Sequence, residues 1–360
     1  MLSIGFHRAI CLATSLLAIA SSGFPCVTRA EEPQAAQRSL TRVDHWQTAF
    51  AEETVAFRWQ VENASAVNGR PTWSLATDQG VTLERGDLSW DVPLKAERTV
   101  EFSLQLPPVK PGIILPLKLT ISAGDDRTRT KLLAEETFWV YPKDPLHERH
   151  TWLKVLNITV YDPARKTTSR LNDAQVPFEE LSNPSALDAE PGSVVIIGEG
   201  ISLREERGLA SPLYRAASNG AKVLWLAPIE GELPLPAAEN SSVPASGLQF
   251  ANREFLASLD KRLDASFWKS QAVVPSATMK LLGNGRDVAV EVTAAAGDWT
   301  WLAVNYPPRG QMISAGKLLV CGLPIIERWE DGPTPRFLFA RLLEHLTDTR
   351  NPTSVQGITR

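Results

Sequence analysis

The first part of the chain alternates apolar and polar residues. Within Thr54–Val61, for example, Val55, Phe57 and Trp59 share one face of an extended segment. This period of two is typical of a half-buried strand. Six further strands of the same kind are expected at 72–76, 81–83, 88–92, 99–106, 115–123 and 133–141, with turn-forming clusters of Gly, Asp, Asn and Pro between them.

Seven short strands without helical periodicity predict a β-sandwich of immunoglobulin type. The cysteine pair that usually joins the two sheets of such a domain is absent from this part of the sequence. Four tryptophans are predicted to fill the core rather than to stack on sugars: Trp59, Trp73, Trp90 and Trp139.

The second part of the chain has continuous apolar runs instead. The first three are Lys154–Tyr161, Ser193–Ile197 and Ala221–Leu226, and continuous runs are typical of strands buried on both faces of a sheet. Between the last two, Leu203–Ser218 has apolar residues at helical spacing and stops at Asn219-Gly220. Strand, helix and strand at this spacing predict a βαβ unit of a mainly parallel sheet.

These patterns predict a multidomain chain, with an all-β immunoglobulin-like sandwich followed by a flavodoxin-like α/β domain. The expected segments are a signal peptide at 1–30, a flexible leader at 31–44, the sandwich at 45–142, a linker at 143–151, the α/β domain at 152–347 and a tail at 348–360. The remaining expected elements are helices at 253–268 and 336–346, strands at 288–292, 299–305 and 316–322, and a loop at 230–247.

Length and composition agree with two folded domains. The chain has 360 residues, of which 43% are hydrophobic and 22% are charged, and domains typically hold about 100–200 residues. This composition excludes a disordered or a disulfide-stapled chain. A net charge of −4 argues against a nucleic-acid-binding surface.

The first thirty residues have the three parts of a secretory signal peptide. A short basic stretch at 1–8 precedes an apolar run at 9–20, and Thr28-Arg29-Ala30 ends in a small residue. The apolar run is shorter than the roughly 20 residues of a membrane span. We therefore expect a periplasmic or extracellular protein without a membrane span after cleavage, with a retained anchor as the alternative. Cleavage would leave Cys321 as the one cysteine, and 35 basic against 41 acidic residues, a charge of −6.

Two sets of motifs carry a resemblance to known families. The first set is Pro71-Thr72-Trp73-Ser74-Leu75, Leu104-Gln105-Leu106-Pro107, Leu117–Ile121 and Phe138-Trp139-Val140-Tyr141-Pro142. It resembles the immunoglobulin-like modules that lie beside the catalytic barrels of family 2 glycoside hydrolases and occur in related secreted bacterial proteins. The second set is Val160-Tyr161-Asp162-Pro163, Val194–Gly200, Asn219–Leu224, Lys317–Cys321 and Trp329. It is similar to the class I glutamine amidotransferase-like fold in a degenerate form.

The departures from these families argue against catalysis. Active amidotransferases place a cysteine on the turn after the strand that is here Ala221–Leu226, but this turn reads Ala227-Pro228-Ile229. They also use a downstream histidine, and His345 lies inside the expected last helix. Cys321 is predicted to be a buried apolar residue. The glycosidase barrel would need roughly 250 further residues.

Polar residues nevertheless gather where the expected parallel strands end. Ligands of open α/β sheets bind at the carboxyl ends of the strands, where backbone N–H groups also hold anions. Six residues are predicted to form a ligand site there: Asp162, Gly198, Glu199, Gly200, Ser202 and Glu230. The alternative is that Gly198 and Gly200 only let the chain turn.

No catalytic set, metal site or cofactor is predicted. A Gly-x-Ser-x-Gly elbow is absent from the sequence, so Ser202 is a weak candidate for a nucleophile. His147-Glu148-Arg149-His150, with Asp144 nearby, lacks the spacing of a helical zinc motif and is interpreted as a solvated hinge.

The favoured hypothesis is an exported, non-catalytic protein for carbohydrate binding or for assembly with a carbohydrate-active enzyme. Two alternatives stay open. One is a hydrolase of carbohydrate-related substrates that uses Asp162 with Glu199 or Glu230, and the other is a purely structural envelope protein.

Overall fold

The computed structural model describes residues 40–44, 46–61, 70–88, 99–124, 131–187, 189–235, 247–251, 259–268, 278–281, 291–293, 301–306 and 315–348. These residues belong to one compact unit, 38–360. The predicted signal peptide, Trp90 and nearly all of the predicted tail lie outside the described residues. None of the described helices is long and apolar enough to cross a membrane.

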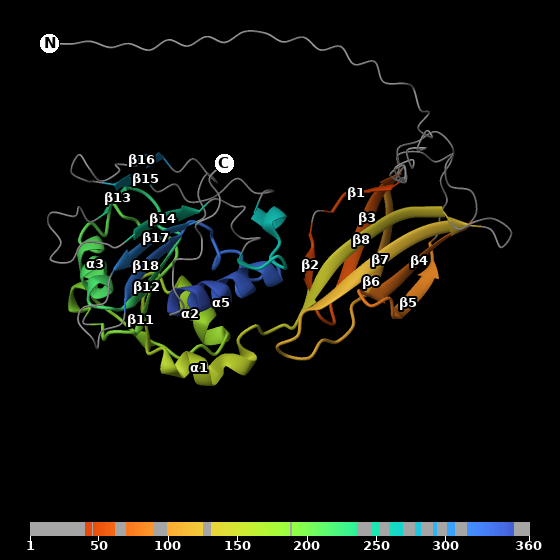
Figure 1. Ribbon diagram of the computed structural model, residues 1–360. Helices are drawn as coiled ribbons and strands as arrows, with labels where there is room; N and C mark the ends of the chain where they lie inside the picture. Colours follow the sequence, from red (N-terminus) through yellow and green to blue (C-terminus); the bar gives the residue numbers. More distant parts are fainter. Residues whose placement is uncertain are drawn as a thin grey trace, which may run out of the picture. The chain divides into compact units, whose positions relative to one another are not determined.

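The first part of the chain forms two sheets. Their strands are β1 (Leu40–Arg42), β2 (Thr48–Phe50), β3 (Thr54–Val61), β4 (Arg70–Thr77), β5 (Thr82–Asp87), β6 (Thr99–Gln105), β7 (Leu115–Gly124) and β8 (Lys131–Tyr141) (Figure 1). One sheet has the order β1-β3-β6, and the other has the order β2-β8-β7-β4-β5. We call these two sheets the first sheet pair.

The two sheets of the first sheet pair share one hydrophobic core. Alternate residues of β7, namely Leu117, Leu119 and Ile121, are buried in it. Phe57 of β3 lies 5.4 Å from the ring of Phe102 and 5.5 Å from that of Phe138. Every second residue of these strands therefore points into the core, which is the two-residue period that predicted them.

Two of the described tryptophans contribute to this core as expected. Trp59 is buried, and Trp73 packs against the core. The prediction for Trp139 was wrong, because Phe138 and Val140 on either side of it point into the core and successive side chains of a strand face opposite ways.

Two local predictions were also wrong in this region. Leu40–Arg42, placed in the flexible leader, pairs with β3 as the edge strand β1. Arg85-Gly86-Asp87, one of the clusters expected to form a turn, here between the predicted strands 81–83 and 88–92, continues β5 instead. A Cβ atom at position 86 would lie 2.9 Å from Nε1 of Trp73. Glycine at this position therefore leaves room for the indole ring of Trp73.

The second part of the chain is built on a seven-stranded sheet in the order β10-β9-β11-β12-β18-β17-β14. Its strands are β9 (Ile158–Tyr161), β10 (Glu179–Glu180), β11 (Val194–Ile197), β12 (Lys222–Leu226), β14 (Gly247–Ala251), β17 (Trp301–Tyr306) and β18 (Gly316–Cys321). The first five strands in the order run parallel, whereas β17 is antiparallel to both of its neighbours. A small separate sheet holds β13 (Glu232–Leu235), β15 (Thr278–Leu281) and β16 (Glu291–Thr293).

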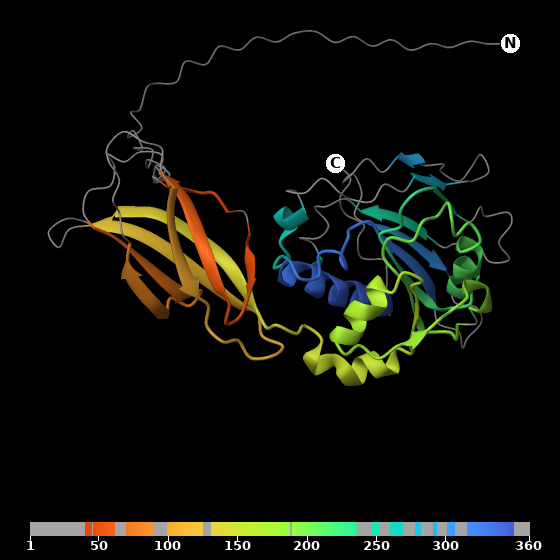
Figure 2. The same ribbon diagram turned by 180° about the vertical axis from the view of Figure 1, so that it is seen from behind.

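Helices pack on both faces of the seven-stranded sheet (Figures 1 and 2). They are α1 (His150–Val155), α2 (Lys166–Asp173), α3 (Ala210–Ser218) and α5 (Pro333–Thr347), with short 3-10 turns at His147–Arg149, Pro184–Ala186 and Ala265–Trp268. Apolar residues of α1, α2 and α5 share one core with one face of the sheet, and those of α3 share another core with the opposite face. The described structure is thus rich in sheet, both parallel and mixed, with few helices.

Several predicted elements of the second part differ from the structure. The loop expected at 230–247 contains β13, and the helix expected at 253–268 is not helical at 260–264 and has a 3-10 turn at Ala265–Trp268 among its described residues. The run 154–161 divides into the end of α1 and β9, because Asn157 between them has a left-handed backbone (φ 45). The predicted linker 143–151 accordingly contains the start of α1. The helix expected from Leu203 begins only at Ala210, since Leu203 N and Arg204 N donate to the carbonyls of Ile229 and Glu230.

Candidate functional site

The six residues predicted as a ligand site lie near the carboxyl ends of β9, β11 and β12. Tyr161 of β9 is opposite Ile197 of β11, so Asp162 and Gly198 follow side by side. α2 leaves β9 on one face of the sheet, and α3 follows β11 on the other face. Open α/β sheets bind ligands at such a switch point.

Asp162 fills the space beside Gly198 rather than leaving it open. A Cβ atom at Gly198 would lie 2.7 Å from Oδ1 of Asp162. Oδ2 accepts hydrogen bonds from the backbone N (2.9 Å) and from Oγ1 (3.3 Å) of Thr168, in the first turn of α2. The first N–H groups of a helix have no partner within it, so this carboxylate stabilises the start of α2. Oδ1 is buried and has no partner among the described atoms.

Glu199 fastens the segment between β18 and α5. Its Oε2 accepts from Ile326 N at 2.7 Å, and its Oε1 accepts from Glu327 N at 2.9 Å. The backbone N of Glu199 donates to Oγ1 of Thr167 in the first turn of α2, so Glu199 also contacts α2. The residue is 7% exposed, and burial raises the pKa of its carboxyl to about 7 although the two N–H donors act in the opposite direction.

Ser202, Gly200 and Glu230 belong to the adjoining turn. Ser202 Oγ donates to Oε2 of Glu230 at 3.4 Å and accepts from Glu205 N at 3.3 Å. Gly200 has a left-handed backbone (φ 80), and its N donates to the carbonyl of Ala227. Glu230 is exposed, so it is the one carboxylate of the six residues that faces solvent.

The groups that amidotransferase chemistry would need are not assembled. The residue that follows β12, Ala227, has no nucleophilic side chain, and its backbone is left-handed (φ 27). Cys321 is fully buried, and burial raises the pKa of its thiol to about 12. His345 Nε2 lies 3.0 Å from Lys317 Nζ near the start of β18, whereas Cys321 ends that strand. Burial lowers the pKa of His345 to about 4.

The two histidines of the predicted linker are also too far apart to bind one metal ion together. The rings of His147 and His150 are 6.5 Å apart, and His147 Nδ1 lies 3.9 Å from Asp144 Oδ2. Within the described ranges no group of three or more His, Cys, Asp or Glu side chains is arranged to hold a metal ion.

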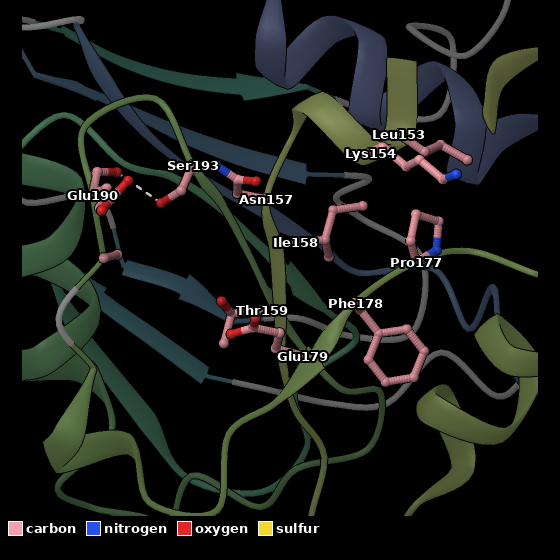
Figure 3. Close-up of a pocket in the computed structure, with 11 residues that line it drawn as sticks. Leu153, Lys154, Asn157, Ile158, Thr159, Pro177, Phe178, Glu179, Glu190 and Ser193 are labelled. Carbon is pink, nitrogen blue, oxygen red and sulfur yellow. Dashed lines mark hydrogen bonds between the residues drawn. The ribbon is translucent and has the colours of Figure 1, made fainter. Parts of the chain in front are cut away.

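A cavity that the sequence did not predict lies at the opposite end of the sheet, where β9, β10 and β11 begin (Figure 3). Its volume is about 500 Å³. It is lined by Leu153, Lys154, Asn157, Ile158, Thr159, Pro177, Phe178, Glu179, Ala189, Glu190 and Ser193. Three separate segments, 153–159, 177–179 and 189–193, contribute these residues, so no motif could reveal the cavity in the sequence.

One side of this cavity is polar, and the other side combines apolar side chains with the charged side chain of Lys154 (Figure 3). In Figure 3, Asn157, Glu190 and Ser193 lie on one side of β9, whereas Pro177 and Phe178 lie on the other. Ser193 Oγ donates to the carbonyl of Glu190 at 2.7 Å. The side chains of Lys154, Asn157 and Glu179 form no hydrogen bond or ion pair in the part of the chain that the structure describes. Their polar groups are therefore open to a ligand.

Comparison with known proteins identifies no family. No protein-family model and no curated protein matches the sequence. Among solved structures, the C-terminal domain of wzt is 18% identical, with 32% of this chain and 81% of that chain covered at a TM-score of 0.22. A beta-glucuronidase from Parabacteroides merdae, with glycerol in its active site, is 11% identical, with 68% and 34% covered at a TM-score of 0.20. A putative beta-galactosidase from Bacteroides fragilis is 11% identical, with 67% and 38% covered at a TM-score of 0.18. The chain thus spans about a third of the length of these two glycosidase chains.

Proposed function

We propose that this chain is an exported, non-catalytic protein that binds carbohydrate or assembles with a carbohydrate-active enzyme. In this proposal residues 1–30 are a signal peptide, 45–142 an immunoglobulin-like sandwich and 152–347 a degenerate amidotransferase-like α/β domain. The observation that carries the non-catalytic assignment is the bonding of Glu199, whose two carboxylate oxygens accept backbone N–H groups.

Carboxylate catalysis needs a group that reaches the substrate. Both oxygens of Glu199 are occupied by Ile326 and Glu327, and Asp162 is bonded to the first turn of α2. These two carboxylates hold segments of the fold together. A structural role for the predicted strand-end residues is therefore favoured over a hydrolytic one.

The binding part of the proposal is supported by the cavity at the other end of the sheet. Ligand sites typically have volumes of about 300–1,000 Å³ and combine apolar walls with a few polar groups. The cavity of about 500 Å³ has this combination. Sugars present hydroxyl groups and apolar C–H faces, and both parts of the lining suit them.

Two experiments test the proposal. A glycan array is probed with the full-length chain, and the full-length chain serves as bait in pull-downs from culture supernatant, in which carbohydrate-active enzymes are the expected partners. Binding to at least one saccharide, or recovery of such an enzyme, is the expected result. Absence of both would overturn the proposal.

One observation favours a hydrolase as the second candidate. A carboxyl pKa of about 7, as for Glu199, is the value of a general acid at neutral pH. The parent chain, Asp162→Asn, Glu199→Gln and Glu230→Gln should be assayed on a broad glycoside panel. The hydrolase reading requires turnover by the parent that Glu199→Gln abolishes, whereas the non-catalytic reading expects no turnover by any of them.

A further inference from the structure

We infer that the cavity where β9, β10 and β11 begin is a binding site for a short neutral saccharide. This inference rests on the proposed function and assigns it a place. The site lies at the opposite end of the sheet from the switch point where the sequence predicted ligand binding. It depends on the two-sided lining, on the unpartnered polar groups and on the balance of charge.

The apolar side offers a surface for a sugar ring. Phe178 is half-buried, packs against the core beneath α1 and α2, and lines the cavity beside Pro177. The C–H face of a pyranose is apolar, and an aromatic ring buries much area at little conformational cost. Phe178 directly precedes β10 and Glu179 begins it, so one short segment supplies both an apolar and a polar contact.

The polar side offers hydrogen-bond groups that the fold does not use. Asn157 supplies an amide that donates and accepts, and its left-handed backbone at the end of α1 fixes where this side chain begins. Glu179 supplies acceptors, and Thr159 opposite it in the β9–β10 pair supplies a hydroxyl. The Ser193 hydroxyl already donates to the backbone carbonyl of Glu190, so its oxygen is left as an acceptor.

The charges of the lining favour a neutral ligand. Glu179 and Glu190 are acidic, and Lys154 is the one basic residue among the lining side chains. This excess of negative charge would repel a uronate, a sulfate or a phosphate. Hydroxyl groups, in contrast, can donate to the carboxylates and accept from the ammonium group.

Isothermal titration with glucose, mannose, galactose and xylose oligosaccharides tests the assignment on the full-length chain. We expect at least one of them to bind the parent. Asn157→Gly should weaken binding at least tenfold, because it removes the amide while glycine keeps the left-handed backbone without strain. Phe178→Leu should also weaken binding at least tenfold, because leucine keeps the apolar packing but has no ring.

Neighbouring residues on β10 provide a matched pair. Glu179→Gln should weaken binding severalfold, whereas Glu180→Gln should leave it unchanged, because Glu180 does not line the cavity and lies 3.9 Å from Arg165 instead. Circular dichroism of each variant checks that it folds.

The outcomes separate this inference from the proposed function. Saccharide binding that survives both Asn157→Gly and Phe178→Leu overturns the assignment of the site and leaves the proposed function standing. If only acidic saccharides bind, the assignment of a neutral ligand to this site is overturned. If no saccharide binds the parent in titration or on the array, the inference fails, and the proposed function then depends on the enzyme partner alone.

Discussion

At the scale of single residues, the contact between Gly198 and Asp162 gives the first prediction. A Cβ atom at position 198 would lie 2.7 Å from Oδ1 and 2.9 Å from Cβ of Asp162, which is itself bonded to α2. Gly198→Ala should therefore lower the free energy of unfolding by about 1–3 kcal/mol, as overpacking does. Urea denaturation measures it. Gly208→Ala is the control, since no atom lies within 4 Å of its Cβ position, and equal costs for the two variants would contradict the prediction.

Glu199 gives a second prediction, on the pH dependence of stability. Its carboxyl pKa is about 7 when folded, against 4.5 for an ordinary glutamate, and burial is the largest cause. The folded state thus keeps a proton that the unfolded state has released. Stability from this group is fully present below pH 4.5 and is lost as the pH rises through 7. The loss is on the order of 3 kcal/mol.

Glu199→Gln tests this, because glutamine resembles the protonated carboxyl and does not titrate. Urea unfolding between pH 5 and 8 should show a weaker decline for the variant than for the parent. His345 contributes with the opposite sign, since its lowered pKa favours stability at high pH, but it is present in both chains. A decline of the same size in both chains would refute the prediction, and the exposed Glu230→Gln is the matched control.

At the scale of elements, the sequence predicted strands well wherever one face is buried. Alternation identified β3, β6, β7 and β8 because their inward residues form the shared core. Continuous apolar runs identified β11, β12 and β18, which are buried on both faces. The pattern reports burial, and burial is what defines these strands.

The errors arose where long-range bonds or backbone conformation decide the structure. The segment after Ser202 is apolar at helical spacing, yet its N–H groups bond to the chain after β12, which no local pattern contains. α2 went unpredicted because its first turn is stabilised by Asp162, four residues before it begins. Topology brings the strand-end residues near one another. The sequence could not show that the carboxylate of Glu199 accepts from Ile326 N and Glu327 N, because these two residues lie far along the chain.

Asp264 gives the prediction at the scale of elements, because it links the start of α5 to the chain beside β2. It is 1% exposed, and its Oδ2 accepts from Gln47 N, beside β2, at 2.8 Å. Its own N–H donates to Oγ1 of Thr334 at the start of α5, and Thr334 shares a hydrogen bond with Thr48 of β2. Asp264→Ala would leave the N–H of Gln47 without this acceptor and would remove a buried side chain, so it should cost about 2–3 kcal/mol of unfolding free energy. Thermal and urea unfolding measure the cost. Asp331→Ala, at a half-exposed ion pair with Arg328, should cost no more than about 1 kcal/mol, and an equal cost would contradict the prediction.

At the scale of the whole molecule, the first sheet pair and the seven-stranded sheet have separate cores but are joined within one compact unit. Besides the Asp264 network, Tyr141 Oη donates to the carbonyl of Arg262 at 2.6 Å, and its ring lies 4.3 Å from that of Phe337 on α5. The Arg336 guanidinium lies 4.8 Å from the centre of the Phe50 ring. Domains joined only by a loose contact move and unfold independently, whereas buried polar and aromatic contacts couple them.

These contacts predict a single cooperative unfolding transition for the parent chain. Tryptophan fluorescence and far-ultraviolet circular dichroism should give coincident urea curves, which is the test for two-state behaviour. The double variant Tyr141→Phe/Asp264→Ala removes hydrogen bonds from this junction while leaving both cores intact, so its two curves should separate. The control is Asp331→Ala, which removes one partner of an exposed ion pair outside this junction and should keep one transition. Two transitions in the parent would show that the two cores unfold independently, and coincident curves in the double variant would show that other contacts couple them.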